Sequence, residues 1–104
     1  MSSIIGDWDV AIKTPIGTLH AVYSFTEHDH AVVGSAAGQG ETVSLSDIAV
    51  TPEAGGQRAT WRQTVTKPMR LKLGFDVLVH GDELSGHSRA GRLPRSTVTG
   101  QRRS

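Results

Sequence analysis

The sequence MRLKLGFDVLV, residues 69–79, decides the fold class, because apolar and polar side chains alternate along it. One side of this stretch is apolar and comprises Met69, Leu71, Leu73, Phe75, Val77 and Val79. A period of two over this length predicts a β-strand with one buried face and one solvated face. The next residues, HGDE at positions 80–83, have the composition of a tight turn, so we expect a return strand from Leu84.

The same alternation recurs along the whole chain, and no segment has the pattern of a helix. The expected strands cover residues 6–13, 19–26, 31–37, 41–50, 59–65, 69–79, 84–90 and 95–103. The fourth should contain a bulge, because Val43 and Leu45 are out of phase with Ile48 and Val50. Eight short strands at regular spacing predict an all-β antiparallel fold, either a closed barrel or a sandwich.

The order of landmark residues repeats within the chain, which we interpret as two four-strand pseudo-repeats in one domain, residues 1–104. A Trp precedes a turn Pro by seven positions twice, at Trp8 and Pro15 and at Trp61 and Pro68. A separation of 52 positions relates Tyr23, His28, Val32 and Gly34 to Phe75, His80, Leu84 and Gly86. The predicted repeats cover residues 5–52 and 58–104, joined by a linker-like segment rich in Gly and Pro.

Composition limits the classes of protein that the chain can represent. The 104 residues include twelve glycines and no cysteine, so disulfides and thiolate metal sites are excluded. No run of eighteen apolar residues is present, and the first residues, MSSIIGD, lack the features of a signal peptide. We therefore expect a cytoplasmic protein with no membrane partner.

Charge is distributed unevenly along the chain. Residues 1–52 hold six acidic residues and one basic residue, whereas residues 53–104 hold four acidic and ten basic ones, so the halves carry about −5 and +6. Two explanations stay open: the halves complement each other within one molecule, or copies associate into a homo-oligomer through opposite faces.

Arginines gather in the last third of the chain and could form a phosphate-binding strip; they are Arg89, Arg92, Arg95, Arg102 and Arg103. Barrels that bind single-stranded nucleic acid add exposed aromatic side chains for base stacking, and here nearly every aromatic residue is in phase with the core. We expect no nucleic-acid partner. No glycine-rich phosphate loop joins a strand to a helix, so we expect no nucleotide cofactor, and no other cofactor either.

The start of the first strand, Gly6-Asp7-Trp8, resembles the Gly-x-Trp motif of the calycin superfamily, which includes the lipocalin-like and avidin-like barrels. In that family an Arg of the last strand packs across this Trp at the closed end of the barrel. Arg102 is in phase with Val98 and Arg103 is not, so the resemblance implies that Arg102 stacks on Trp8. It also implies that the strands close into an eight-stranded antiparallel up-and-down barrel with a ligand inside.

The expected inner faces supply candidate ligand contacts, which mix large apolar side chains with two polar ones. The candidate ligand-binding residues are Trp8, Tyr23, Phe25, Trp61, Gln63, Leu71, Leu73 and Phe75. Tyr23 could donate a hydrogen bond to a ligand carbonyl, or act as a general acid if its pKa were lowered, and Gln63 could orient a polar group. The alternative is that both are structural: a buried Tyr with its hydroxyl at the rim, and an amide bonded to backbone.

We expect the protein to bind a small, mostly apolar organic molecule in the barrel. The alternative is a cofactor-independent isomerase, cyclase or lyase acting on a hydrophobic metabolite in the same cavity, with Tyr23 and Gln63 as catalytic residues. A third hypothesis is an interaction or assembly domain with a filled core.

Three histidines raise the question of a metal site. His28 and His30 are two positions apart, which would place both on one face of a strand, and His80 occupies the equivalent turn of the second repeat. All three fall at expected hairpin turns, where solvated polar residues are common, so we expect no bound metal.

Overall fold

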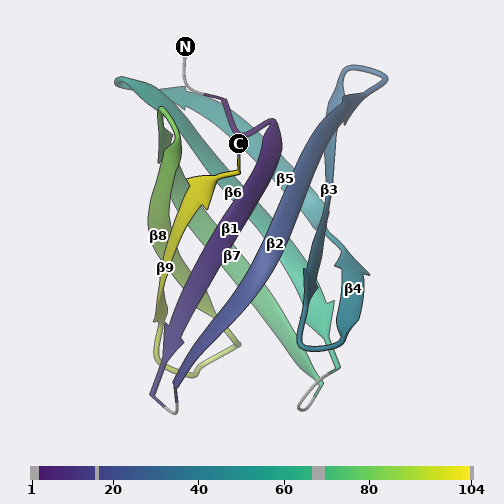
Figure 1. Cartoon of the computed structure of the whole chain (residues 1–104), viewed down its shortest axis with the longest axis vertical. Helices are drawn as coiled ribbons and strands as arrows, with labels where there is room; N and C mark the ends of the chain where they lie inside the picture. The colour runs from purple at the N-terminus through teal and green to yellow at the C-terminus, as the bar shows by residue number, and fades with distance from the viewer. Residues whose placement is uncertain (1–2, 16, 67–69, 104) are drawn as a thin grey trace.

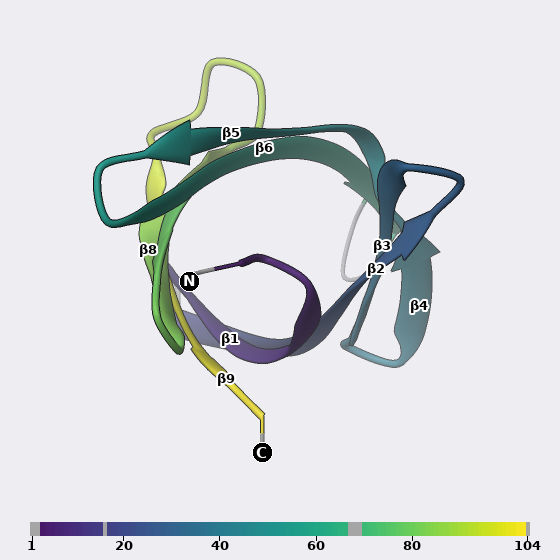
Figure 2. The ribbon, with the colours of Figure 1, turned by 90° about the horizontal axis from the view of Figure 1, so that it is seen from above.

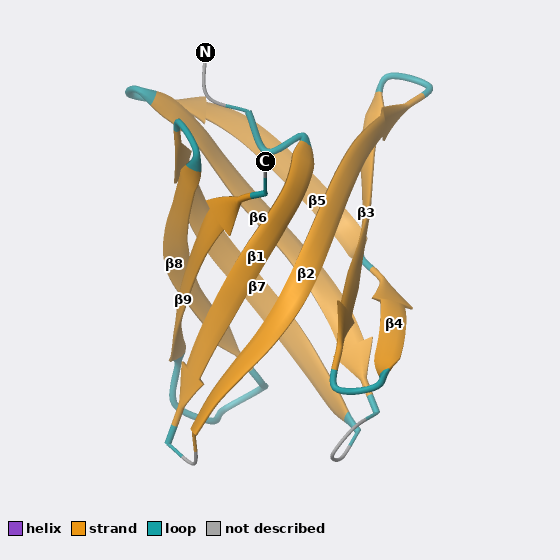
Figure 3. Ribbon diagram, in the orientation of Figure 1, coloured by secondary structure: helices purple, strands orange, loops and turns teal. Residues whose placement is uncertain are grey.

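A computed structural model describes residues 3–15, 17–66 and 70–103, and these form strands joined by short loops (Figures 1 and 3). The nine strands are β1 (Gly6–Thr14), β2 (Gly17–His28), β3 (Ala31–Gly38), β4 (Glu41–Ser44), β5 (Ser46–Glu53), β6 (Gly56–Val65), β7 (Leu71–His80), β8 (Glu83–Arg89) and β9 (Ser96–Arg102). All pair antiparallel in one sheet of order β4-β3-β2-β1-β9-β8-β7-β6-β5. Pairing of β1 with β9 joins the two halves of the chain, and the sheet is nearly closed into a barrel (Figure 2).

The alternation of side chains along each strand decides which face is buried. In β7 the odd-numbered positions point into the barrel and the even-numbered ones face outward, as predicted. The core contains the inward apolar residues of the strands and one residue that precedes β1: Ile4, Trp8, Val10, Ile12, Tyr23, Phe25, Ala36, Ala59, Trp61, Phe75, Val77, Val79, Leu84 and Val98. The prediction of an all-β antiparallel barrel is therefore confirmed in its class.

The number of strands is nine, so the prediction of eight strands in two repeats was wrong. The expected strand 41–50 is divided at Leu45: β4 pairs with β3, and β5 pairs with β6. The predicted bulge is present, because the β5–β6 register shifts between Ser46 and Ala49, and Asp47 adopts a left-handed φ of 52°. One bulged segment thus supplies both edge strands of the sheet, β4 and β5. The first half of the chain therefore contains five strands and the second half four.

This divided segment brings the two ends of the sheet together. The Leu45 amide donates a hydrogen bond of 2.9 Å to the carbonyl oxygen of Gly34 on β3. At the start of β4, the Glu41 carboxylate accepts bonds from the Thr66 amide (2.8 Å) and hydroxyl (2.6 Å), next to the end of β6. Side chains and one backbone bond therefore close a gap that a continuous ladder would close in a regular barrel.

The linker expected near residues 51–57 is not a linker. Strand β5 continues to Glu53 and pairs with β6, so only Ala54 and Gly55 connect them. Pro52 is tolerated because β5 is an edge strand of the ladder. The expected turn at Lys67 and Pro68 and the inward position of Met69 lie outside the described residues, as does Ile16 of the first turn.

No segment of the described ranges is a helix of the length and apolarity needed to cross a membrane.

Candidate ligand-binding site

One end of the barrel is covered by the residues that precede β1. The segment bends over the ring of strands, as Figure 2 shows, and inserts Ile4, which is 1% exposed. The Ile4 amide donates to Gln57 Oε1 (3.0 Å), and its carbonyl oxygen accepts a bond from Trp8 Nε1 (2.8 Å). Both bonds satisfy polar groups that burial would otherwise leave unpaired. We call this end the closed end.

Arg102 fastens this covering segment to the barrel. Its guanidinium carbon lies 4.3 Å from the centroid of Trp8, and its Nη atoms donate to the carbonyl oxygens of Ile5 and Ser3, each at 2.6 Å. Its Nε donates to Asp82 Oδ1 at 2.9 Å. The predicted stacking of Arg102 on Trp8 is confirmed, with a planar cation on an indole face and its donors on backbone oxygens.

Steric contacts explain why the Gly-x-Trp motif begins with glycine. Gly6 has a φ of 131°, which side chains rarely adopt, and a Cβ there would lie 2.6 Å from an Nη of Arg102. Gly6 therefore leaves space for the guanidinium that covers Trp8.

On β1, β2, β6 and β7, inward side chains become more exposed toward the opposite end of the barrel. Along β1 the exposure rises from 0% at Trp8 to 9% at Ile12, and along β2 it rises from 0% at Phe25 to 36% at Leu19. Strands β6 and β7 follow the same order, because each has its fully buried residues near the closed end and a half-buried one, Val65 or Leu71, at the other. Inward side chains of these four strands are therefore most exposed at one end, which we call the open end.

Four aromatic side chains meet in the middle of the barrel, between the two ends. The Trp61 and Phe75 rings stack with centroids 5.0 Å apart, and Phe25 contacts Trp61 edge-on at 5.2 Å. Tyr23 lies 5.6 Å from Trp61 and 5.8 Å from Phe75. These distances are those of favourable aromatic pairs, so the cluster forms a packed floor beneath the open end.

Gln63 is the polar residue at this floor. Its Oε1 accepts bonds from the Tyr23 hydroxyl (2.8 Å) and Trp61 Nε1 (3.1 Å). An indole N–H can only donate, so the amide atom that faces Trp61 must be the oxygen, and the amide nitrogen faces elsewhere. Within the described residues nothing bonds to that Nε2 atom, whose two N–H groups remain available to a bound molecule.

Burial raises the pKa of Tyr23, and its hydrogen bond to Gln63 offsets this effect only in part. The phenol is therefore neutral over the physiological range and donates its proton to Gln63. A general acid would need the opposite shift, so this environment counts against the catalytic role that the sequence allowed for Tyr23.

Most of the predicted site residues do come together. Tyr23, Phe25, Trp61, Gln63 and Phe75 form the floor, and Leu71 and Leu73 lie along β7 toward the open end. Trp8 is the cross-strand neighbour of Tyr23, and Arg102 of the closed end covers it.

Sequence analysis missed some interior residues. Ile4 precedes any periodic pattern, so it carries no signal of burial. Ser88 is 4% exposed and pairs with Phe75. Its phase with Leu84 along β8 could have placed it inside.

The three histidines do not form a site. His28 ends β2 and lies 3.4 Å from Asp29 in an exposed pair, whereas His30 lies in the turn with a φ of 66°, so they do not share a strand face. His80 ends β7 against Gly55. Among the described residues no group of three or more His, Asp or Glu side chains is arranged to hold a metal ion.

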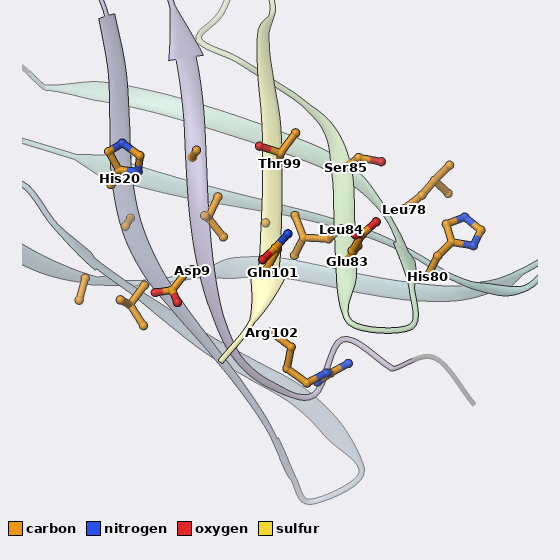
Figure 4. A pocket seen from close by; sticks show the side chains of 16 residues that line it. Asp9, His20, Leu78, His80, Glu83, Leu84, Ser85, Thr99, Gln101 and Arg102 are labelled. Carbon is orange, nitrogen blue, oxygen red and sulfur yellow. The ribbon is translucent and has the colours of Figure 1, made fainter. Parts of the chain in front are cut away.

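Two depressions lie on the outer surface of the barrel. The larger, about 800 Å³, is an open groove over β1, β9 and β8 (Figure 4). Thr99 and Gln101 form its floor, with Asp9 on one side and Ser85 and Glu83 on the other. The smaller, about 650 Å³, lies over β6, β7 and β8.

Comparison of the chain with protein-family models, curated proteins and solved structures found no match.

Proposed function

We propose that the protein binds a small, mostly apolar organic molecule, which enters the open end and rests on the aromatic floor. The observation that carries the proposal is the one-sided exposure of the inner face. Apolar side chains such as Ala21, Leu71 and Leu73 are only half-buried, although they point into the barrel. Covering them with an apolar ligand would remove this surface from water, at about 25 cal/mol per Å².

Gln63 would orient the ligand. Its oxygen is committed to Tyr23 and Trp61, so the contact available is donation from Nε2. A ligand with a carbonyl, ether or hydroxyl oxygen at one end would accept this bond while its apolar part contacts the walls. The calycin-like arrangement of Trp8 and Arg102 supports the same proposal, since barrels of that kind hold ligands inside. The cytoplasmic location expected from the sequence is part of the proposal.

The test is binding of a neutral fluorescent probe, N-phenyl-1-naphthylamine, which lacks charge and therefore reports apolar sites. Two substitutions of one chemical type form a matched pair. Ala21→Leu adds volume inside the open end, whereas Ala37→Leu adds the same volume on the exposed outer face of β3. We expect the first to weaken binding at least about fivefold and the second to leave it unchanged. Equal effects, or no binding by the wild type, would contradict the proposal.

A second variant tests the polar contact without removing the acceptor of the floor. Gln63→Glu keeps oxygens facing Tyr23 and Trp61 but replaces the N–H donor with an acceptor. Weaker binding of an oxygen-bearing ligand such as 2-naphthaldehyde, with unchanged binding of naphthalene, supports donation from Gln63. Equal losses for both ligands would show that the substitution acts through packing alone.

A further inference from the structure

A bare patch interrupts the outer face of the barrel at Gly74. This residue has no side chain, and its neighbours in register are Arg62 on β6 and Arg89 on β8. The outer surface is therefore hollowed between two arginines, and the floor of the resulting pit of about 650 Å³ is strand backbone. A Cβ at position 74 would meet no atom within 4 Å, so no packing requires glycine here.

A third arginine comes to the same pit from the loop that follows β8. Arg95 lines the pit, and Arg89 Nε donates to the carbonyl oxygen of Leu93 (3.2 Å), which ties this loop to the strand beside the pit. Arginines from β6, β8 and the loop thus line the same pit, although Arg62 is far from the other two in the sequence.

The charges around the pit are not balanced. Asp76 lies at its edge, but Arg58 Nε donates to its carboxylate (2.9 Å) and compensates its charge. The other ionisable groups of the lining are Asp47 and His87. Within the described part of the chain, neither Arg62 nor Arg95 has an ion-pair partner within 4.0 Å. Three like charges that share a pit repel one another, and a bound anion would relieve that repulsion.

We infer that the pit over Gly74 binds a phosphate group of a small molecule. Guanidinium forks donate two parallel hydrogen bonds to phosphate oxygens, and three of them from different directions suit a tetrahedral oxyanion. The missing side chain lets the group approach the strand. Nucleic acid fits less well, because the neighbouring rings of Trp61 and Phe75 face the interior and offer no stacking surface.

This site is independent of the proposed apolar ligand, because it occupies the opposite face of the same wall. Its test is a ¹H–¹⁵N NMR titration at constant ionic strength with inorganic phosphate, with glycerol 3-phosphate and with a single-stranded oligonucleotide. We expect saturable shifts of amides around Gly74, with a Kd of about 1–10 mM for a solvent-exposed site. Tighter binding of glycerol 3-phosphate identifies an organic phosphate, and equal binding identifies free phosphate; both outcomes support the site.

Variants locate the binding. Gly74→Val fills the pit, and since β-branched residues suit strands it should abolish the shifts without lowering Tm. Arg62→Gln should weaken binding about fivefold, whereas Arg92→Gln, which removes the same charge outside the pit, should weaken it less than about twofold. Equal effects of the two arginines, phosphate binding retained by Gly74→Val, or shifts with the oligonucleotide alone would overturn the inference.

Discussion

The two ends of this barrel are built from similar strands but differ in what covers them. At the closed end, Ile4 and Arg102 cover Trp8, and among the described residues no buried side-chain nitrogen or oxygen lacks a hydrogen-bond partner. At the open end, inward residues such as Leu19 and Leu71 remain partly in water. The closed end is thus covered and hydrogen-bonded, whereas inward apolar side chains stay partly exposed at the open end. The aromatic floor lies between the two ends.

The largest expected effect on stability comes from replacing a leucine with alanine, a substitution that can be made at each end of the barrel. Leu84→Ala, near the closed end, removes a side chain that is 3% exposed and should cost about 3 kcal/mol in the free energy of unfolding. Leu71→Ala removes a half-buried side chain and should cost about 1 kcal/mol. Urea denaturation of both variants measures the difference, and equal costs would show that the ends are equally sealed.

The next effect concerns the floor. Gln63→Leu should cost about 2 kcal/mol, because the Tyr23 hydroxyl and the Trp61 indole N–H lose their shared acceptor while remaining buried. The double variant Gln63→Leu/Tyr23→Phe should recover part of this loss, since the Tyr23 hydroxyl, one of the two buried donors left without an acceptor, is then absent. Thermal unfolding provides the measurement, and no recovery would mean that Gln63 contributes by packing.

Arg102→Lys at the closed end should have a smaller effect and lower the free energy of unfolding by about 1.5 kcal/mol. Lysine keeps the charge but not the planar fork that covers Trp8 and donates to the carbonyl oxygens of Ser3 and Ile5. Amide hydrogen exchange should increase at Ile4, whose N–H is bonded to Gln57, while the aromatic floor keeps its protection. Faster exchange throughout the barrel would contradict a local cap.

The smallest effect belongs to neither end. The hydrogen bond from Arg58 lowers the pKa of Asp76. A depressed pKa in the folded state stabilises the protein above the unfolded value of about 3.9, and this contribution is lost as the pH falls through the folded value. The pair is solvent-exposed, so we expect Asp76→Asn to cost at most about 0.5 kcal/mol at neutral pH. The difference in Tm between wild type and variant should vanish in acid.

The sequence predicted the walls of the barrel well, because buried and exposed side chains alternate at neighbouring positions of a strand. It placed Phe75 and Trp61 inside, found the bulge between Leu45 and Ile48, and chose Arg102 over Arg103 by phase. These inferences depend on residues that are close together in the chain. The stacking of Arg102 on Trp8 itself was implied by the calycin resemblance.

The failures share a cause, which is that pairing between distant strands leaves no local pattern. The division of β4 from β5 depends on which neighbour each half meets. The cap formed by Ile4 depends on Gln57, 53 positions away. The pit at Gly74 depends on the register of three strands, and a single glycine within an alternating stretch does not reveal it.

Intermolecular NMR contacts can test whether small apolar molecules enter the barrel from the open end alone, as proposed. With N-phenyl-1-naphthylamine bound, we expect nuclear Overhauser effects from the probe to the methyl groups of Ala21, Leu71 and Leu73, and none to Ile4. Contacts confined to Ile4, or to outward residues such as Leu78, would place the probe elsewhere and rule out entry from the open end.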